Sequence, residues 1–176
     1  MERFLPGTTL GLDDEAGSPE MRIKSLFLAG GLTLSQVASV TGLEPYTVQN
    51  WVKRGFLSPP QKKRYTLEQL CRLININLLR GILPLEESLH LMEYLNGDLA
   101  DESDDLVADS QLYFLFVSLF DQVRSSEDLN NALDRLTADY SDPGTREKLR
   151  QVLRVMDLCW AANCLRAKAE TIMQTL

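Results

Sequence analysis

The residues best suited to binding another molecule lie in the first half of the chain, from Ser35 to Arg64. Amide and hydroxyl side chains alternate there with bases, and five Lys or Arg residues fall between positions 53 and 64. In the major groove of DNA, Asn and Gln pair with adenine, and Lys and Arg pair with guanine. The expected contacts to base edges are Thr47, Gln49, Asn50 and Lys53. The expected contacts to phosphates are Ser35, Tyr46, Arg54, Lys62, Lys63 and Arg64.

The charge of the chain is divided unevenly along its length. The 176 residues carry a formal charge of −7, which taken alone argues against general binding to polyanions, because phosphate contacts need clustered bases. Residues 22–96, however, carry nine bases against five acids, whereas residues 97–176 carry eight against fifteen. The positive middle of the chain therefore keeps local binding to nucleic acid open.

The pattern between Thr33 and Arg54 predicts two short helices joined by a tight turn. The first helix is expected over 33–41 and the second over 45–54, with Gly42 in the left-handed conformation that a tight turn requires. The apolar residues of this segment repeat at helical spacing and form an inner face of Val37, Leu43, Val48 and Trp51. Packing of that face directs the candidate contacts of the second helix outward. Two helices linked in this way form the helix-turn-helix unit.

The segment that follows cannot continue the helix, because Pro59 and Pro60 interrupt it. We expect residues 56–65 to form a small hairpin or wing that carries basic side chains at its tip. A helix is expected to follow over 66–80, opened by a capping box from Thr66 to Gln69, and another over 84–95.

These residues resemble the winged helix-turn-helix of MerR-type regulators over about 32–95. The resemblance rests on the Thr41-Gly42 turn, on Trp51, on the run from Gly55 to Pro59 and on the Arg64-Tyr65 pair. Over about 23–123 the chain is similar to an uncharacterised bacterial family of MerR-like proteins, known as a numbered domain of unknown function. The chain departs from the MerR pattern at Gln49 and Asn50, where an Arg and an aromatic residue are typical, and its wing is shorter. The resemblance implies a regulator that binds double-stranded DNA, without transferring a sequence preference.

The predicted fold is mainly α, with a flexible segment over 1–17, the MerR-like winged helix-turn-helix over 18–96 and a helical domain over 97–176. An apolar helix is expected from Asp104 to Arg124, preceded by acids that favour its N-terminus, and a final long helix from Pro143. The final helix carries two adjacent apolar stripes, of which one consists of Leu149, Leu153, Met156, Trp160 and Cys164 and the other of Val152, Val155, Cys159 and Ala162. One of the two stripes is expected to cover the apolar helix, and the other is expected to meet a second subunit. The helical domain would then serve homodimerisation or the sensing of an unknown small-molecule effector.

Other classes of function find little support in the sequence. No apolar run approaches the ~20 residues of a membrane span, and the acidic N-terminus does not read as a secretory signal. Three cysteines form no metal-binding motif, and no phosphate loop or dinucleotide fingerprint occurs. We therefore expect a cytoplasmic protein that is not an enzyme and needs no cofactor. The alternative to a DNA-binding regulator is a protein-interaction adaptor whose winged helix no longer binds DNA.

Overall fold

In the computed structural model, the described residues are 4–11, 17–99, 101, 103, 105–125 and 128–175. They contain eight helices: α1 (Pro19–Ser25), α2 (Leu34–Thr41), α3 (Pro45–Lys53), α4 (Leu67–Leu79), α5 (Leu85–Asn96), α6 (Asp109–Arg124), α7 (Leu129–Leu136) and α8 (Pro143–Met173). Within these ranges the extended structure is limited to isolated antiparallel bridges, so the prediction of a mainly helical fold is confirmed.

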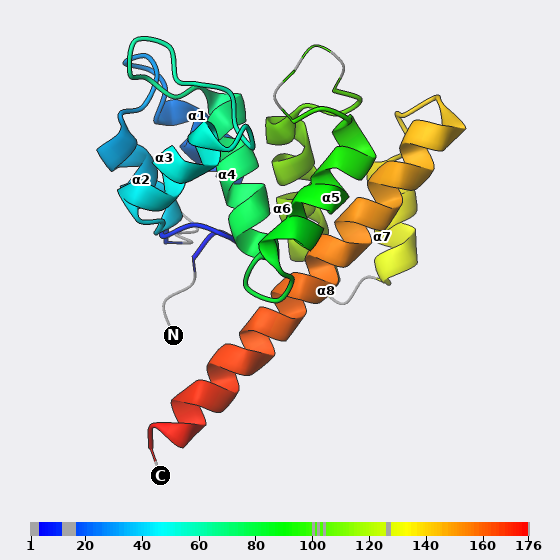
Figure 1. The fold of residues 1–176 in the computed structure, drawn as a ribbon. Coiled ribbons are helices and arrows are strands. Elements are labelled where there is room, and N and C mark those ends of the chain that lie inside the picture. The colour runs from blue at the N-terminus through cyan, green and yellow to red at the C-terminus, as the bar shows by residue number, and fades with distance from the viewer. Residues whose placement is uncertain are drawn as a thin grey trace.

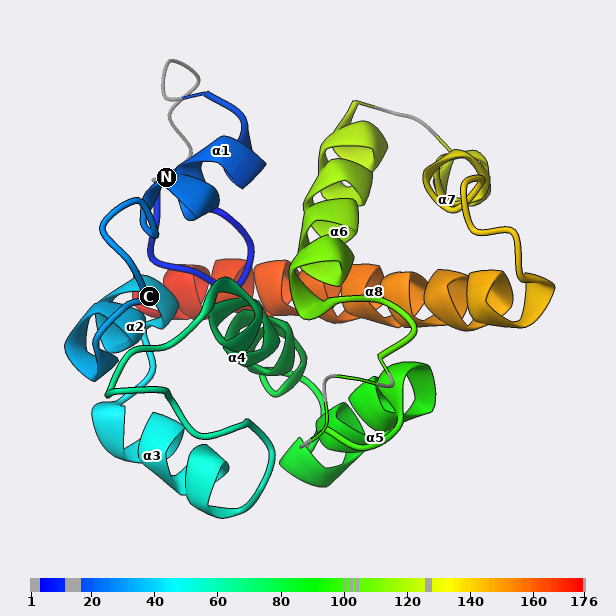
Figure 2. The ribbon, with the colours of Figure 1, turned by 90° about the horizontal axis from the view of Figure 1, so that it is seen from above.

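The helices pack around α4 and α8, as Figures 1 and 2 show. Helices α1 to α3 gather at one side of α4, whereas α5, α6 and α7 lie along the N-terminal part of α8. The C-terminal end of α8 projects beyond the rest of the molecule (Figure 1). One buried apolar cluster joins both halves of the chain, since it includes Ile74 of α4, Phe116 of α6 and Met156 of α8. Helix α4 packs against α2, α5, α6 and α8 and thereby connects the two halves, whereas α3 packs on α2 and α1 on α6.

A buried ionic cluster fixes α4 to the segment before α6. The guanidinium of Arg72, only 2% exposed, donates from Nε to Oδ2 of Asp109 at 2.7 Å and from Nη2 to Oδ2 of Asp105 at 3.1 Å. Its Nη1 also donates to the carbonyl of Leu99. Burial raises the pKa of Asp109 to about 7, although the neighbouring Arg72 acts to lower it.

The helix predicted from Asp104 starts instead at Asp109. Both Asp105 and Asp109 are bound by Arg72, a residue far away in the sequence, so these two carboxylates serve the buried ionic cluster at the N-terminal end of α6. Asp104 itself lies outside the described residues.

Residues 4–11 are packed against the body, whereas the sequence predicts a flexible segment over 1–17. Leu5 is fully buried, the amide of Thr9 donates to the carbonyl of Val40 at 2.9 Å, and the Tyr113 hydroxyl donates to the carbonyl of Pro6 at 3.0 Å. This segment thus ties α2 to α6. Residues 1–3 and 12–16 lie outside the described residues.

Helix α8 begins at Asp142, whose carboxylate accepts the amide of Thr145 at 2.7 Å, and continues for 31 residues. Val152 and Cys159 are buried in the protein's own core together with Leu149, Leu153 and Met156. Members of both predicted stripes therefore lie in the same core, and the expected division of the two stripes between the core and a second subunit is wrong. In the part of the chain that the structure describes, we find no helix with the length and apolarity that crossing a membrane demands.

Candidate nucleic-acid interface

Helices α2 and α3 are joined by a short turn that local hydrogen bonds close. Thr33 and Gln36 form a reciprocal capping box at the start of α2, and Gly42 ends that helix with a φ of 68°, in the left-handed region. The hydroxyl of Thr41 donates to the carbonyl of Val37 and accepts the amide of Leu43 at 3.2 Å. The predicted helix boundaries and the predicted role of Gly42 are confirmed.

The inner face predicted for this unit is buried. Val37, Leu43, Val48 and Trp51 are at most 4% exposed. The guanidinium of Arg80, which follows α4, lies 5.7 Å from the centre of the Trp51 ring, close enough for a cation–π contact. Burial of this face against α2, together with the contact from Arg80, thus fixes the rotation of α3 about its own axis and determines which residues face outward.

We call Tyr46, Gln49, Asn50 and Lys53 the outer face of α3. At about 100° per residue, these four side chains fall within an arc of about 100°, opposite Val48 and Trp51. Tyr46 is 76% exposed, Gln49 and Lys53 are exposed, and Asn50 is half-buried. Within the part of the chain that the structure describes, none of the four side chains has a hydrogen-bonding or ionic partner. The outer face is therefore free to contact another molecule.

The remaining candidates of this unit lie beside the outer face. Thr47 is half-buried on the flank of α3, and the guanidinium of Arg54 lies 4.5 Å from the Phe56 ring centre. Ser35 is exposed in the first turn of α2, with its hydroxyl 3.1 Å from that of Thr33. The structure thus groups Tyr46, a predicted phosphate contact, with three of the predicted base-edge contacts, and it places Thr47 apart from them.

Residues 61–64 form a tight turn, which we call the lysine turn. Gln61 and Arg64 form an antiparallel bridge, in which the amide of Arg64 donates to the carbonyl of Gln61 at 2.8 Å. The two central residues, Lys62 and Lys63, have φ values of 48° and 61°, as a type I′ hairpin turn requires. Both lysines are exposed. The hairpin predicted over 56–65 is thus a turn closed by a single bridge.

Contacts on both sides hold the lysine turn in place. Leu32 and Tyr65 exchange backbone hydrogen bonds of 2.9 and 2.8 Å, and Arg64 donates to the carbonyl of Gly31 at 3.1 Å. A Cβ at Gly31 would lie 2.7 Å from the carbonyl oxygen of Tyr65, so this approach requires glycine. The Gln69 side chain donates to the carbonyl of Ser58 at 2.8 Å and anchors the preceding segment. Arg64 is therefore partly a structural residue, whereas Lys62 and Lys63 are not.

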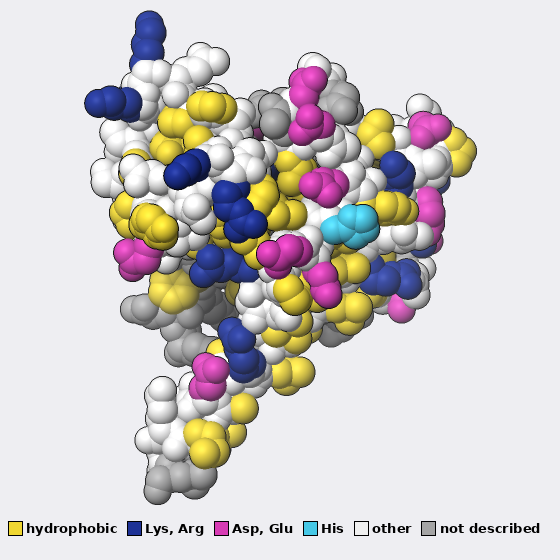
Figure 3. All heavy atoms as spheres, in the orientation of Figure 1, with side chains coloured by type: hydrophobic (Ala, Val, Ile, Leu, Met, Phe, Trp, Pro, Cys, Tyr) yellow, Lys and Arg dark blue, Asp and Glu magenta, His cyan; other side chains and the backbone are white. Residues whose placement is uncertain are grey.

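The surface charge is unevenly distributed on the face shown in Figure 3. Lys and Arg side chains lie over the part that carries α2, α3 and α4, whereas Asp and Glu predominate over α5 and the loop that follows it. This division matches the positive net charge of residues 22–96. The outer face of α3 and the lysine turn both belong to that positive part.

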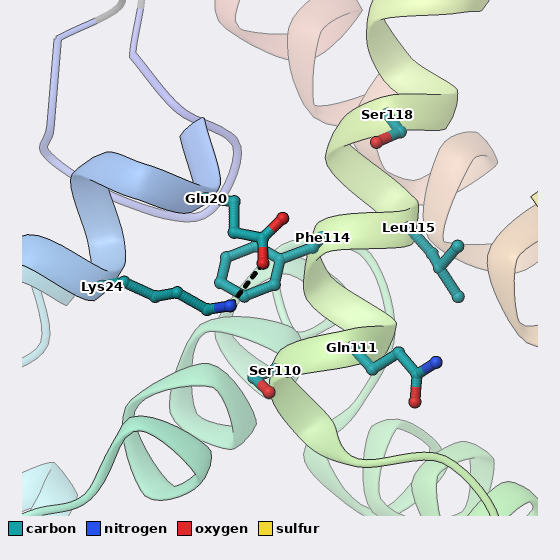
Figure 4. Close-up of a pocket in the computed structure, with 7 residues that line it drawn as sticks. All are labelled: Glu20, Lys24, Ser110, Gln111, Phe114, Leu115 and Ser118. Carbon is teal, nitrogen blue, oxygen red and sulfur yellow. Dashed lines mark hydrogen bonds and ion pairs between the residues drawn. The ribbon is translucent and has the colours of Figure 1, made fainter. Parts of the chain in front are cut away.

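A pocket of about 400 Å³ lies between α1 and α6, in the view of Figure 4. Its two charged groups bind each other, since Lys24 Nζ lies 2.5 Å from Glu20 Oε1, and the ammonium also lies 5.7 Å from the centre of the Phe114 ring. Ser110, which also lines the pocket, donates to Glu68 at 2.6 Å. These contacts join α1 and α4 to α6. The charged groups of the pocket and the Ser110 hydroxyl are therefore already paired with groups of the protein itself.

Comparisons with known proteins find similarity to the part of the chain that carries the outer face of α3 and the lysine turn. Residues 31–116 match a family model described as a domain of unknown function (DUF1836). An uncharacterized protein of Bacillus subtilis (strain 168), YkrK, is 27% identical to the chain over 84 residues, which make up 46% of this chain and 36% of YkrK. No solved structure matches the chain. The family match begins just before α2 and ends within α6, so it includes the outer face of α3, the lysine turn and Arg72.

Proposed function

We propose that this protein is a transcriptional regulator that binds double-stranded DNA through a MerR-like winged helix-turn-helix. In this proposal α2 and α3 form the helix-turn-helix, and α3 enters the major groove as the recognition helix. The lysine turn takes the place of a longer wing and contacts neighbouring phosphates. The alternative is an adaptor that binds another protein through the same surface.

The observation that carries the proposal is the outer face of α3. Its amide, phenol and ammonium groups project from a helix whose other side is fixed by Trp51, and the rest of the protein does not use them. Gln49 and Asn50 present the donor and acceptor pair that binds adenine, and Lys53 presents the donors that bind guanine. Tyr46 supplies a further hydroxyl to a base edge or a phosphate.

The lysine turn supports the same conclusion. Left-handed backbone costs an ordinary residue about 1–2 kcal/mol, and Asn and Gly are the residues that suit such a turn. Lys62 and Lys63 adopt this conformation although their side chains contribute no contact to the fold. Retaining two exposed cations at unfavourable positions is consistent with a role in binding phosphates.

We further propose that the protein acts as a homodimer. Helix-turn-helix proteins commonly bind two half-sites that are separated by one turn of DNA, and two subunits add their affinities for them. The net charge of residues 22–96 is only +4, so a single subunit would release few counterions and bind weakly.

The proposal is tested by the salt dependence of binding to a fluorescent duplex, measured by anisotropy. The slope of log K against log salt concentration is about −0.9 for each neutralised phosphate, so the double variant Lys62→Ala, Lys63→Ala should lose about 2 from that slope. Asn50→Ala should leave the slope unchanged and alter which duplexes bind best.

The double variant Lys148→Ala, Arg154→Ala, which removes the same charge from α8, is the control and should bind like the wild type. It also removes the contact of Lys148 with the Tyr94 ring and the hydrogen bond from Arg154 to Asn130, so its circular dichroism is measured alongside. If both double variants lost the same affinity for the duplex, binding would depend only on the overall charge of the protein. Absence of binding by the wild type would favour the adaptor.

A further inference from the structure

Helix α8 carries a row of exposed apolar side chains that its own chain does not cover. Leu158, Leu165 and Ile172 are 60%, 66% and 61% exposed. They follow one another at intervals of seven residues, which is the spacing of one position in a coiled-coil heptad. Val155, Ala162 and Ala169 repeat at the same interval and lie on the same side of the helix. These six residues, which we call the α8 stripe, form a seam about 27 Å long.

At its N-terminal end the α8 stripe opens into a groove beside α5. The groove has a volume of about 440 Å³ and is lined by Val155 of α8 together with Leu83, Leu91 and Tyr94. Figure 3 shows hydrophobic side chains both along the projecting part of α8 and beside α5. An apolar seam on a projecting helix thus continues into an apolar hollow on the body.

We infer that the α8 stripe and this groove bind the α8 stripe of a second copy, with the two helices antiparallel. A two-fold axis between Asn163 and Cys164 brings every stripe residue of one copy opposite a stripe residue of the other. The pairs are Val155 with Ile172, Leu158 with Ala169, and Ala162 with Leu165. This inference rests on the homodimer of the proposed function and specifies its interface.

The order of large and small residues favours a second copy as the occupant. Each exposed Leu of the stripe lies opposite an Ala of the other copy, so that every layer combines one large and one small side chain. Such alternation allows two helices to approach closely without voids. In a parallel pair, Leu165 would instead lie opposite Leu165 and Ala162 opposite Ala162. Layers of two large side chains would then alternate with layers of two small ones.

The ends of the paired helices also find partners in this register. Ile172 of the second copy lies beside Val155, next to the groove, and Met173 points to the same side as α5. Met173 is 68% exposed in the single chain, and the groove offers it an apolar environment. A residue at the end of the helix thus fills the hollow on the other body.

The charges near the stripe do not prevent this pairing. Asp157 lies level with Glu170 of the second copy, but at about 100° per residue both side chains point about 110° away from the centre of the stripe. Arg166 lies opposite Ala161 of the second copy, and Lys168 lies opposite Cys159. Arg166 also donates to the carbonyl of Gly81 at 2.8 Å and lies near Glu170, so its charge is already partly compensated. The register therefore sets no two cations directly against each other.

The oligomeric state of the full chain tests the interface, measured by light scattering after size-exclusion chromatography. The wild type at micromolar concentration should have twice the mass of one chain, and Leu165→Asp should reduce that mass by half while its circular dichroism stays unchanged. Leu28→Asp is the matched control, because Leu28 is 89% exposed at the far side of the molecule and should stay dimeric when changed. A monomeric wild type, or a dimeric Leu165→Asp, would overturn the inference.

The antiparallel register is tested by disulfide formation in a background with Cys164→Ser. The double variant Leu158→Cys, Ala169→Cys should crosslink into dimers, because these positions face each other only between copies. Within one helix they are about 16 Å apart and cannot bond. Crosslinking of Leu158→Cys alone would indicate parallel helices and overturn the register.

Failure of this inference and failure of the proposed function give different results. A protein that binds DNA as a monomer would contradict the interface and retain the function. A dimer that is disrupted by Leu165→Asp but never binds DNA would support the interface and contradict the function.

Discussion

Lys62 and Lys63 hold a backbone conformation that lysine seldom adopts. Their φ values of 48° and 61° place both in the left-handed region, where a Cβ approaches the following carbonyl oxygen. The bridge between Gln61 and Arg64 and the contacts of Tyr65 with Leu32 enforce this turn from both sides. The two cations therefore occupy positions where the fold alone would favour other residues.

Replacing the pair by Lys62→Asn, Lys63→Gly should separate stability from binding. Asn-Gly is the preferred sequence of a type I′ turn, so the free energy of unfolding in urea should rise by about 1–2 kcal/mol. Affinity for duplex DNA should fall, because two phosphate contacts are lost. If the variant were no more stable than the wild type, the lysines would not be strained. If it bound DNA equally well, they would not contact phosphates.

At the scale of elements, the turn between α2 and α3 sets the direction of the outer face. Gly42 has a φ of 68°, and a Cβ there would lie 3.2 Å from Cγ2 of Thr9, which belongs to the packed N-terminal segment. The position thus demands glycine for two independent reasons: the backbone conformation and the close approach of residues 4–11.

We expect Gly42→Ala to reduce the free energy of unfolding by about 1–2 kcal/mol, as measured by urea denaturation. Gly144→Ala is the control for the backbone conformation, since Gly144 lies in the first turn of α8 outside the left-handed region and Ala favours helix. A Cβ there would lie 3.3 Å from Oδ2 of Asp142, a contact almost as close as that at Gly42, so the two changes differ mainly in backbone conformation. Gly144→Ala should leave the free energy of unfolding unchanged or raise it. Equal destabilisation by both changes would contradict the special role of the turn.

Much of this first half could be predicted from the sequence, because its determinants are local. The capping box at Thr66, Gly42 and the buried pair Val48 and Trp51 all act within a few residues, and the structure agrees with each. The capping box of Thr33 with Gln36 is equally local but was not predicted. The order of the predicted helices along the whole chain is also that of the structure.

Features that depend on distant contacts could not be predicted. The first residue of α6, Asp109, binds Arg72, which lies 37 residues earlier in the chain, and no local pattern reveals this contact. Residues 4–11 look flexible in isolation, and their order comes from Val40 and Tyr113. The exposed stripe of α8 combines Val155 and Ala162, which belong to one of the two predicted stripes, with Leu158 and Leu165, which belong to neither. The sequence does not reveal how far the core reaches around a long helix.

At the scale of the whole molecule, the account assigns the two ends of the fold to different tasks. In the proposed complex, the positively charged part with α2, α3 and the lysine turn would face DNA, and the projecting end of α8 would join two copies. Helix α4 connects them, since its core residues pack against α6 and α8 and Arg72 fixes it to the acidic segment. The acidic second half carries a net charge of −7 and would be repelled from the DNA backbone. Such a molecule would approach DNA in one orientation.

The central claim is that the outer face of α3 recognises a DNA sequence, and selection of bound duplexes from a random pool tests it most directly. The account predicts that the wild type enriches one motif, repeated as two inverted half-sites about one helical turn apart. It also predicts that Asn50→Ala changes the enriched bases without abolishing recovery. Recovery of an unenriched pool, or of the same motif with both proteins, would contradict the claim.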